Sequence, residues 1–310
     1  MTGIRAQYEF SVLNHEGRIR EYARQSLSEN SRKALTGDLR HFTDWGGNIP
    51  ANPETISRYI SDHAEVHSIA TIKRRLASIS KAHNMSGYDN PVSSELVKMV
   101  MRGVQRQHGK PQRQAAPILK EDLTVMLSHT PDNLKGQRDK ALLILGFCAA
   151  LRRSELVGIQ AQDLEFNAQG LILTITRSKT DASGTGEKIA IPYGRGKICP
   201  VKLVCLWLEN SGIENGPLFV SFRKGNIPTG ERLSDRAVSD IIKHYAAKAG
   251  LNPERHSGHS LRSGLATSAA MHGVSSWKIR AQTRHKSDAM LARYIRDGDM
   301  FTDNAAGSLF

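Results

Sequence analysis

Cysteine and long apolar runs are both scarce in this sequence. The 310-residue chain has three cysteines, Cys148, Cys199 and Cys205, and no pair of them is spaced as Cys-x-x-Cys. Such an odd, sparse set argues against a disulfide framework and favours a reducing compartment. No apolar run reaches the roughly 20 residues that a membrane helix needs, and the N-terminus MTGIRAQYEF lacks the layout of a signal peptide. We therefore expect the protein to stay in the cytoplasm.

Acidic residues are also few compared with basic ones. The chain holds 43 Lys and Arg against 30 Asp and Glu, which gives a formal net charge of +13. An excess of this size attracts polyanions, and the release of counterions from phosphates adds affinity. Solubility alone needs much less excess charge. The charge therefore favours a nucleic acid as partner, although it names no chemistry.

The length of the chain predicts two domains. Apolar residues at helical spacing predict helices in the first hundred residues, over 28–45, from Pro53 onward, over 70–83 and through 96–101. Residues 105–117 are polar and basic and contain one glycine and two prolines, a composition typical of a linker. This segment divides a helical front domain of residues 1–104 from a back domain of residues 118–310.

The back domain is also expected to be mostly helical, with a small β element. Residues 140–151 are strongly apolar, which predicts a buried helix. Residues 171–177 are rich in β-branched side chains and predict a strand, and residues 188–192 are expected to return beside it after a turn at 181–186. Further helices are expected near 201–207, from Ser234 to Gly250, and over most of 259–294. The expected fold class is mainly α with a small β-sheet or hairpin.

Basic side chains and one tyrosine follow one another in the back domain in an order that suits strand breakage in DNA. They are Arg152 before Arg-Ser-Glu-Leu, Lys179 in Arg-Ser-Lys-Thr, His259 and Arg262 in His-Ser-Leu-Arg, His285 in Arg-His-Lys-Ser, and Tyr294 in Ala-Arg-Tyr-Ile. Breaking a strand without hydrolysis requires a nucleophile and cationic donors for the non-bridging oxygens of the transition state. It also requires a proton for the leaving oxygen. Arginine suits the clamp because its planar fork gives two donors in fixed geometry.

This order resembles the tyrosine recombinase, or phage integrase, family over nearly the whole chain. The family pattern is an Arg before Ser-Glu-Leu, a Lys in a β-hairpin, His-x-x-Arg, a later His or Trp, and a Tyr nine positions on, as Tyr294 follows His285. The chain departs from the pattern at two places. Ala150 and Arg284 stand where the family often has glycine.

The resemblance implies a site-specific recombinase that works through a 3′-phosphotyrosyl bond and a Holliday junction. A helical core-binding (SAM-like) front domain and a catalytic back domain would clamp the DNA, with four protomers on two sites. Tyr294 would attack while Arg152 and Arg262 hold the phosphate. His259 would act as acid or base, His285 would hydrogen-bond the phosphate, and Lys179 would protonate the leaving 5′-oxygen. We expect no ATP, metal or other cofactor.

Several assignments keep an alternative. Glu155 is expected either to orient Arg152 or to form a plain surface salt bridge, and Lys188 is the substitute if Lys179 has no role. His256 and His259 form a His-x-x-His pair, but a zinc site would need more ligands at suitable spacing. The alternative functions are a type IB topoisomerase-like relaxing enzyme and a DNA-binding regulator without turnover.

DNA contacts outside the catalytic set are expected at basic side chains that lie apart from the apolar stripes. Lys73 and Arg74 belong to a basic edge of the helix over 70–83, which is free to enter a major groove. Arg40, Arg236 and Lys243 are further candidates. We expect double-stranded DNA as partner, in a prokaryotic, phage or plasmid setting close to the nucleoid.

Overall fold

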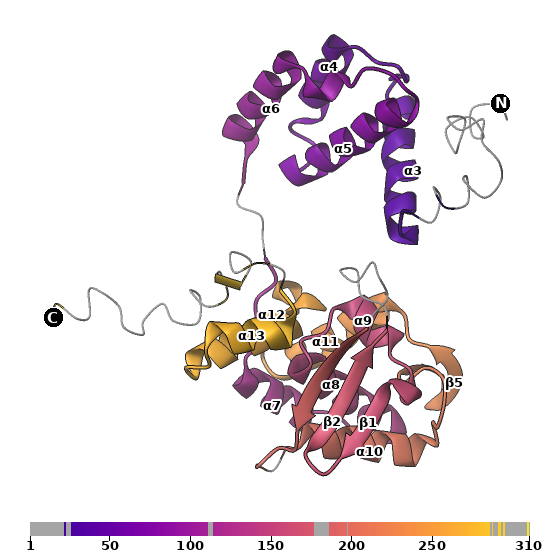
Figure 1. Cartoon of the computed structure of the whole chain (residues 1–310), viewed down its shortest axis with the longest axis vertical. Helices are drawn as coiled ribbons and strands as arrows, with labels where there is room; N and C mark the ends of the chain where they lie inside the picture. The colour runs from indigo at the N-terminus through magenta and orange to yellow at the C-terminus, as the bar shows by residue number, and fades with distance from the viewer. Residues whose placement is uncertain are drawn as a thin grey trace. The chain divides into compact units, whose positions relative to one another are not determined.

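The chain divides into two compact units, residues 1–112 and residues 113–310, which we call the front unit and the back unit. The computed structural model describes residues 22, 26–110, 114–176, 186–196, 198–285, 287, 291–292, 294 and 309 (Figure 1). None of the helices in this described part combines the length and the apolar character that a membrane crossing needs.

The described residues of the front unit form a bundle of four α-helices. These are α3 (Glu29–Asp44), α4 (Pro53–His63), α5 (Ile69–Met85) and α6 (Glu95–His108). Each begins after a residue whose side-chain oxygen accepts a backbone N–H of the first turn, namely Ser28, Asn52, Ser68 and Ser94. Their apolar faces meet in a core around Phe42, Tyr59 and Ile72. The helices expected from the sequence are confirmed, but α6 continues to His108 and so runs into the segment predicted as a linker.

A three-stranded antiparallel sheet lies in the back unit. Strand β1 (Leu164–Asn167) pairs with β2 (Gly170–Ile175), and β2 pairs with β3 (Glu187–Pro192). Leu171, Leu173 and Ile175 alternate on the buried face of β2, which confirms this strand and its returning partner. The turn expected at 181–186 lies outside the described residues except for Gly186. A second hairpin, β4 (Val220–Arg223) with β5 (Ile227–Arg232), was not expected from the sequence.

Helices lie behind the sheet and around the core of the back unit, and one face of the sheet stays exposed (Figure 1). They are α7 (Lys120–Ser128), α8 (Leu134–Cys148), α9 (Arg153–Gly158), α10 (Pro200–Ser211), α11 (Asp235–Lys248), α12 (His259–Met271) and α13 (Ser276–Thr283). Helix α8 is buried over most of its length and contacts α7, α10 and α12. The helix predicted over 140–151 is therefore present, but it begins earlier, at Leu134, and ends at Cys148.

A buried ion pair fixes α8 against its neighbours. Arg138 donates to the carboxylate of Asp139, with Nε 2.9 Å from Oδ1, and to the carbonyl of Val220 at 3.0 Å. The hydroxyl of Tyr245 on α11 donates to the second carboxylate oxygen of Asp139 at 2.9 Å. Because each buried polar atom named here has a partner, the network is stabilising rather than costly. The network joins the first half of α8 to Val220 and to α11.

Candidate active site

Arg152 and Glu155 meet where the chain leaves α8 and begins α9. Arg152 is the residue before α9, and its backbone N–H donates to Glu155 Oε2 at 2.9 Å. Its guanidinium Nη1 lies 2.5 Å from Glu155 Oε1. Glu155 is buried, with 4% of its surface exposed, whereas one fifth of the Arg152 side chain remains accessible. Glu155 therefore pairs with Arg152 from a buried position rather than through a surface salt bridge, and its orienting role in the reaction stays a prediction.

Arg284 is a second arginine that contacts the same carboxylate, and it was not predicted as a site residue. Its Nη2 donates to Glu155 Oε2 at 2.8 Å, and its side chain is 6% exposed. Burial opposes ionisation of Glu155, but Arg284 and the two bonds from Arg152 outweigh it and hold the pKa of Glu155 below its ordinary value. The only sequence signal was a basic residue in place of a family glycine, next to His285.

The two departures from the family pattern share one backbone feature. Ala150 has a φ of 48° and Arg284 a φ of 55°, both in the left-handed region that glycine enters without strain. Arg284 lies at the C-terminal cap of α13, a common place for glycine. The backbone thus keeps the conformation that a glycine would allow, while the side chain of Arg284 adds a cation to the site.

The carbonyl of Ala150 holds Arg262. Arg262 lies on α12, is 2% exposed, and donates from Nη1 to Ala150 O at 2.7 Å. Its other terminal nitrogen, Nη2, is buried and has no hydrogen-bond partner among the described residues. Burial, together with Arg152 and Arg284, lowers the pKa of Arg262 to about 10, so the guanidinium stays charged at neutral pH. A buried, charged donor without a partner is costly unless an anion binds it.

Substitutions at Ala150 test its left-handed backbone conformation. We expect Ala150→Gly to change the free energy of unfolding by less than about 1 kcal/mol, because relief of left-handed strain offsets the lost methyl burial and the added chain entropy. Ala150→Val adds overpacking to a stronger left-handed penalty, which together cost about 2–4 kcal/mol. Thermal unfolding of both variants measures the difference. A valine variant as stable as the glycine variant would contradict the left-handed conformation of Ala150.

Two histidines flank the arginines. His259 begins α12 and keeps solvent contact, and partial burial with the charges of Arg262 and Arg152 lowers its pKa. His285 is buried, and burial with the same two arginines lowers its pKa to about 4. Both rings are therefore neutral at neutral pH in the DNA-free protein, and a phosphate anion in the site would favour their protonation.

The contacts of His285 decide which ring nitrogen carries the proton. The hydroxyl of Thr283 donates to Ile279 O at 2.7 Å and therefore accepts from His285 Nδ1, also at 2.7 Å. This assignment leaves Nε2 of His285 as an acceptor. The predicted donation from Nε2 of His285 to a phosphate therefore requires that the ring first gains a second proton, for example from a neighbouring hydroxyl.

Tyr294 lies beside His285. The centroids of the two rings are 5.7 Å apart and the ring planes are tilted by 35°. The tyrosine is half-buried and packs against a small apolar cluster that includes Ala266, Ile279 and Leu291. A negative charge on its phenol oxygen favours the charged form of Arg262. Five of the six predicted catalytic residues thus belong to one neighbourhood of the back unit, in which Arg262 and His285 are the most buried.

The position of the predicted catalytic lysine is not described. Lys179 lies outside the described residues. Lys188, its substitute, is exposed on β3 opposite Thr174 of β2. The role of either lysine in the reaction stays a prediction.

The candidate DNA-contact residues of the front unit are exposed side chains, and two of them contact other side chains of the unit. Lys73 Nζ donates to the amide oxygen of Gln105 at 2.8 Å, and Arg74 Nη1 lies 2.5 Å from the buried carboxylate of Asp38. Arg40 is exposed on α3. Each of these contacts leaves donors that a phosphate could use, so their assignment to DNA remains a prediction.

The candidates of the back unit lie on α11. The side chain of Arg236 is 92% exposed, with Nε 3.9 Å from Asp240, which is a weak surface contact. Lys243 donates to both carboxylate oxygens of Glu254 at 3.0 Å. The charge of Arg236 is less neutralised by its own contacts than that of Lys243. A DNA contact by either residue remains a prediction.

Comparisons with known proteins identify the family of the chain. Residues 117–299 match the phage integrase family. An "Integrase/recombinase xerD homolog" of Selenomonas ruminantium is 41% identical over 296 residues, which cover 92% of this chain and 87% of that protein. "Recombinase cre" of Escherichia phage P1 is 29% identical over 304 residues, which cover 90% of this chain and 87% of that protein.

Solved structures share the fold. The XerH site-specific recombinase, in a post-cleavage complex with a palindromic difH substrate, is 15% identical with a TM-score of 0.64, and the match covers 90% of this chain and 78% of that one. A lambda integrase dimer bound to a COC′ core site is 16% identical with a TM-score of 0.65, and the match covers 97% and 82% of the two chains. The family match spans the arginines, both histidines and Tyr294, and the chain belongs to the phage integrase family of tyrosine recombinases.

Proposed function

We propose that this protein is a site-specific DNA recombinase that cuts and rejoins strands through a 3′-phosphotyrosyl bond to Tyr294. The observation that carries the proposal is the buried guanidinium of Arg262, whose Nη2 has no partner among the described residues and which lies close to two further arginines. The three arginines face the carboxylate of Glu155 and that of Glu187, which lies 3.6 Å from Arg284 Nη1. One positive charge remains in excess, which suits a phosphodiester. Tyr294, beside His285, supplies the hydroxyl that such a phosphate would meet.

The reaction follows from the groups that are present. The phenol oxygen of Tyr294 attacks phosphorus as the bond to the 5′-oxygen breaks, so one phosphoester bond forms for each one lost. Arg152 and Arg262 stabilise the charge on the non-bridging oxygens of the transition state. His259 or the free Nε2 of His285 accepts the phenol proton, and Lys179 protonates the leaving 5′-oxygen. Attack by a 5′-hydroxyl of the other duplex reverses these steps without ATP.

Assembly on DNA belongs to the same proposal. The exchange of strands between two duplexes needs a cleaved strand in each, so we expect four protomers on two sites, acting two at a time. The lambda integrase structure holds a dimer on a core site, which supports binding of adjacent protomers to one DNA site. The protein would work in the cytoplasm, at the nucleoid.

A plasmid assay tests this function against its alternatives. Footprinting on DNA next to the gene would first locate the binding site, and two copies of the site would then be placed in one supercoiled plasmid. We expect deletion or inversion of the segment between the copies, with no relaxation of a plasmid that lacks the site. Relaxation of any plasmid would indicate a type IB topoisomerase-like enzyme. Binding without any change in the DNA would indicate a regulator.

The role of Lys179 has its own test. We expect Lys179→Ala to slow cleavage by about 10²–10⁴-fold, because the leaving 5′-oxygen loses its proton donor. A 5′-bridging sulfur leaves as a stable thiolate without a proton, so most of the defect should disappear on a phosphorothiolate substrate. Lys188→Ala tests the substitute assignment, because a defect in this variant that disappears on the phosphorothiolate substrate, with normal cleavage by Lys179→Ala, would give the proton transfer to Lys188. An equal defect of Lys179→Ala on both substrates would make this lysine a binding residue.

A further inference from the structure

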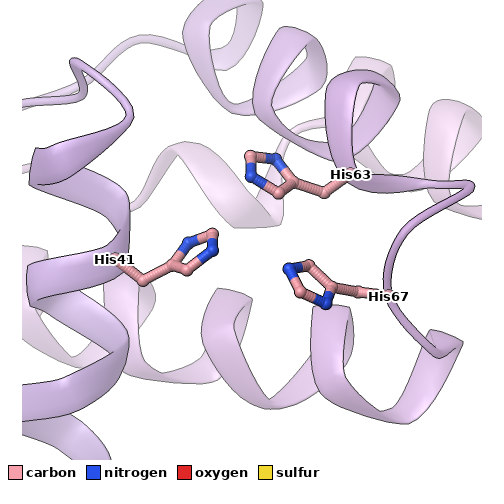
Figure 2. Close-up of side chains that lie close together, drawn as sticks. All are labelled: His41, His63 and His67. Carbon is pink, nitrogen blue, oxygen red and sulfur yellow. The ribbon is translucent and has the colours of Figure 1, made fainter.

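Three histidines come together in the front unit, whereas the active-site residues belong to the back unit. They are His41 on α3, His63 at the end of α4, and His67 in the connection between α4 and α5, and Figure 2 shows their rings pointing toward one another. One nitrogen of each ring lies within 4.8 Å of the other two. All three side chains are half-buried. This group was not predicted from the sequence, in which His256 and His259 were the histidine pair weighed as metal ligands.

The backbone places His63 and His67 as a chelating pair. The N–H of His67 bonds to the carbonyl of His63 at 3.0 Å, so one more helical turn follows α4. Residues four apart in a helix lie on one face, and the two rings are parallel within 5° with centroids 5.5 Å apart. Histidines at this spacing supply two ligands to one ion in known zinc sites. His41 approaches from a different helix, with its centroid 4.9 Å from that of His63 and 5.3 Å from that of His67.

Tyr59 orients two of the rings from the buried side. His63 Nδ1 lies 2.8 Å from the carbonyl of Tyr59, which only accepts, so Nδ1 carries the proton and Nε2 has a free lone pair. His41 Nδ1 lies 2.9 Å from the hydroxyl of the same tyrosine. The hydroxyl can accept from Nδ1, and in that tautomer Nε2 of His41 is also free to bind a metal. Metal-binding histidines commonly have such a partner on the other ring nitrogen, which fixes the tautomer and the ring orientation.

Two charged residues near the cluster, Arg75 and Asp38, affect the binding of a cation in opposite directions. Arg75 lies close enough to His41 and His67 for its positive charge to act on both rings. The same charge repels a cation. The buried carboxylate of Asp38, 3.9 Å from Arg75 Nε, offsets part of this repulsion. Ligand type and geometry therefore favour a metal that prefers neutral imidazole over one that prefers carboxylates.

We propose that His41, His63 and His67 bind one zinc ion, with a water molecule as fourth ligand. Zinc takes imidazole nitrogens at about 2.0–2.1 Å in a tetrahedral arrangement, which puts the nitrogens about 3.4 Å apart. Rotation of the half-buried rings brings the nitrogens from within 4.8 Å to that separation. The ion would join the C-terminal part of α3 to the turn that leads into α5. It would thereby hold the helix that carries Lys73 and Arg74.

Zinc titration of the full chain, prepared without a histidine tag and freed of metal by a chelator, tests the site. We expect one Zn²⁺ per chain by calorimetry, no binding of Mg²⁺, and a higher unfolding temperature with zinc than without. His63→Gln and His67→Gln should each weaken zinc binding by more than tenfold and lose the temperature shift. Co²⁺ should give the visible absorption of a tetrahedral site in the unaltered protein only.

A histidine outside the cluster gives the matched control. His108→Gln, at the end of α6, should bind zinc like the unaltered protein. Circular dichroism of the metal-free variants should match the metal-free parent, which separates loss of ligands from misfolding. Absence of zinc binding by the parent would overturn the proposal, and so would undiminished binding by both cluster variants. Neither result would affect the proposed recombinase activity, whose residues lie in the back unit.

Discussion

Tyr294→Phe is expected to abolish covalent attachment to DNA while leaving DNA affinity within about twofold of the unaltered protein. The substitution removes one hydroxyl and keeps the ring that contacts His285 and the apolar cluster around Ala266. Loss of a nucleophile costs several orders of magnitude in rate, since the other groups cannot replace the bond that it forms. A suicide substrate trapped on a denaturing gel measures the adduct, and a gel shift measures binding.

The control for this experiment is another tyrosine of the same unit. Tyr193 is exposed just after β3, and Tyr193→Phe should form the adduct like the unaltered protein. If the Tyr294→Phe variant still formed the adduct, the nucleophile would be a different residue. If both variants lost it, the defect would lie in folding rather than in chemistry.

Glu155→Ala is expected to destabilise the protein by about 3–5 kcal/mol, because it leaves two arginines around a buried position without their shared carboxylate. Both Arg152 and Arg284 contact this side chain, and Arg284 is almost fully buried. For a unit of this size the loss corresponds to a fall of roughly 10 °C in unfolding temperature. Thermal unfolding of the DNA-free protein measures it.

Two further variants separate stability from positioning. Glu165→Ala, at an exposed position of β1, should change stability by less than about 0.5 kcal/mol. Glu155→Gln keeps a hydrogen-bond acceptor of the same shape and should be less destabilising than the alanine. It should nevertheless slow cleavage, because a neutral amide holds Arg152 less firmly than a carboxylate. If Glu155→Ala unfolded at the same temperature as Glu165→Ala, the shared carboxylate would have no structural role.

The helices of the front unit were predictable because their signals are local. Ser28 and Asn52 cap the helices that the sequence indicated, and the apolar stripes run continuously behind them. Strand β1 gave no such signal, since its residues are mostly exposed and its four positions are too few for a clear alternation. The end of α6 is polar and exposed to solvent, and this composition is the same as that of a linker.

The active site was predictable as a set of residues but not as a set of contacts. The ordered motifs gave Arg152, Arg262 and Tyr294, while the pairing of Glu155 with Arg284 depends on the fold that brings positions 155 and 284 together. The histidine cluster could not be predicted for the same reason. His41 is 22 positions before His63, and only the packing of α3 against the end of α4 joins them.

The covalent bond to Tyr294 is the central claim, and mass spectrometry of the DNA-linked peptide tests it most directly. A suicide substrate would trap the intermediate, and digestion with protease and nuclease would leave one peptide that carries a nucleotide. Fragmentation should place the added mass on Tyr294, in the peptide around Ala292, and a labelled substrate should show attachment to the 3′-phosphate. Attachment to any other residue, or to a 5′-phosphate, would contradict the account.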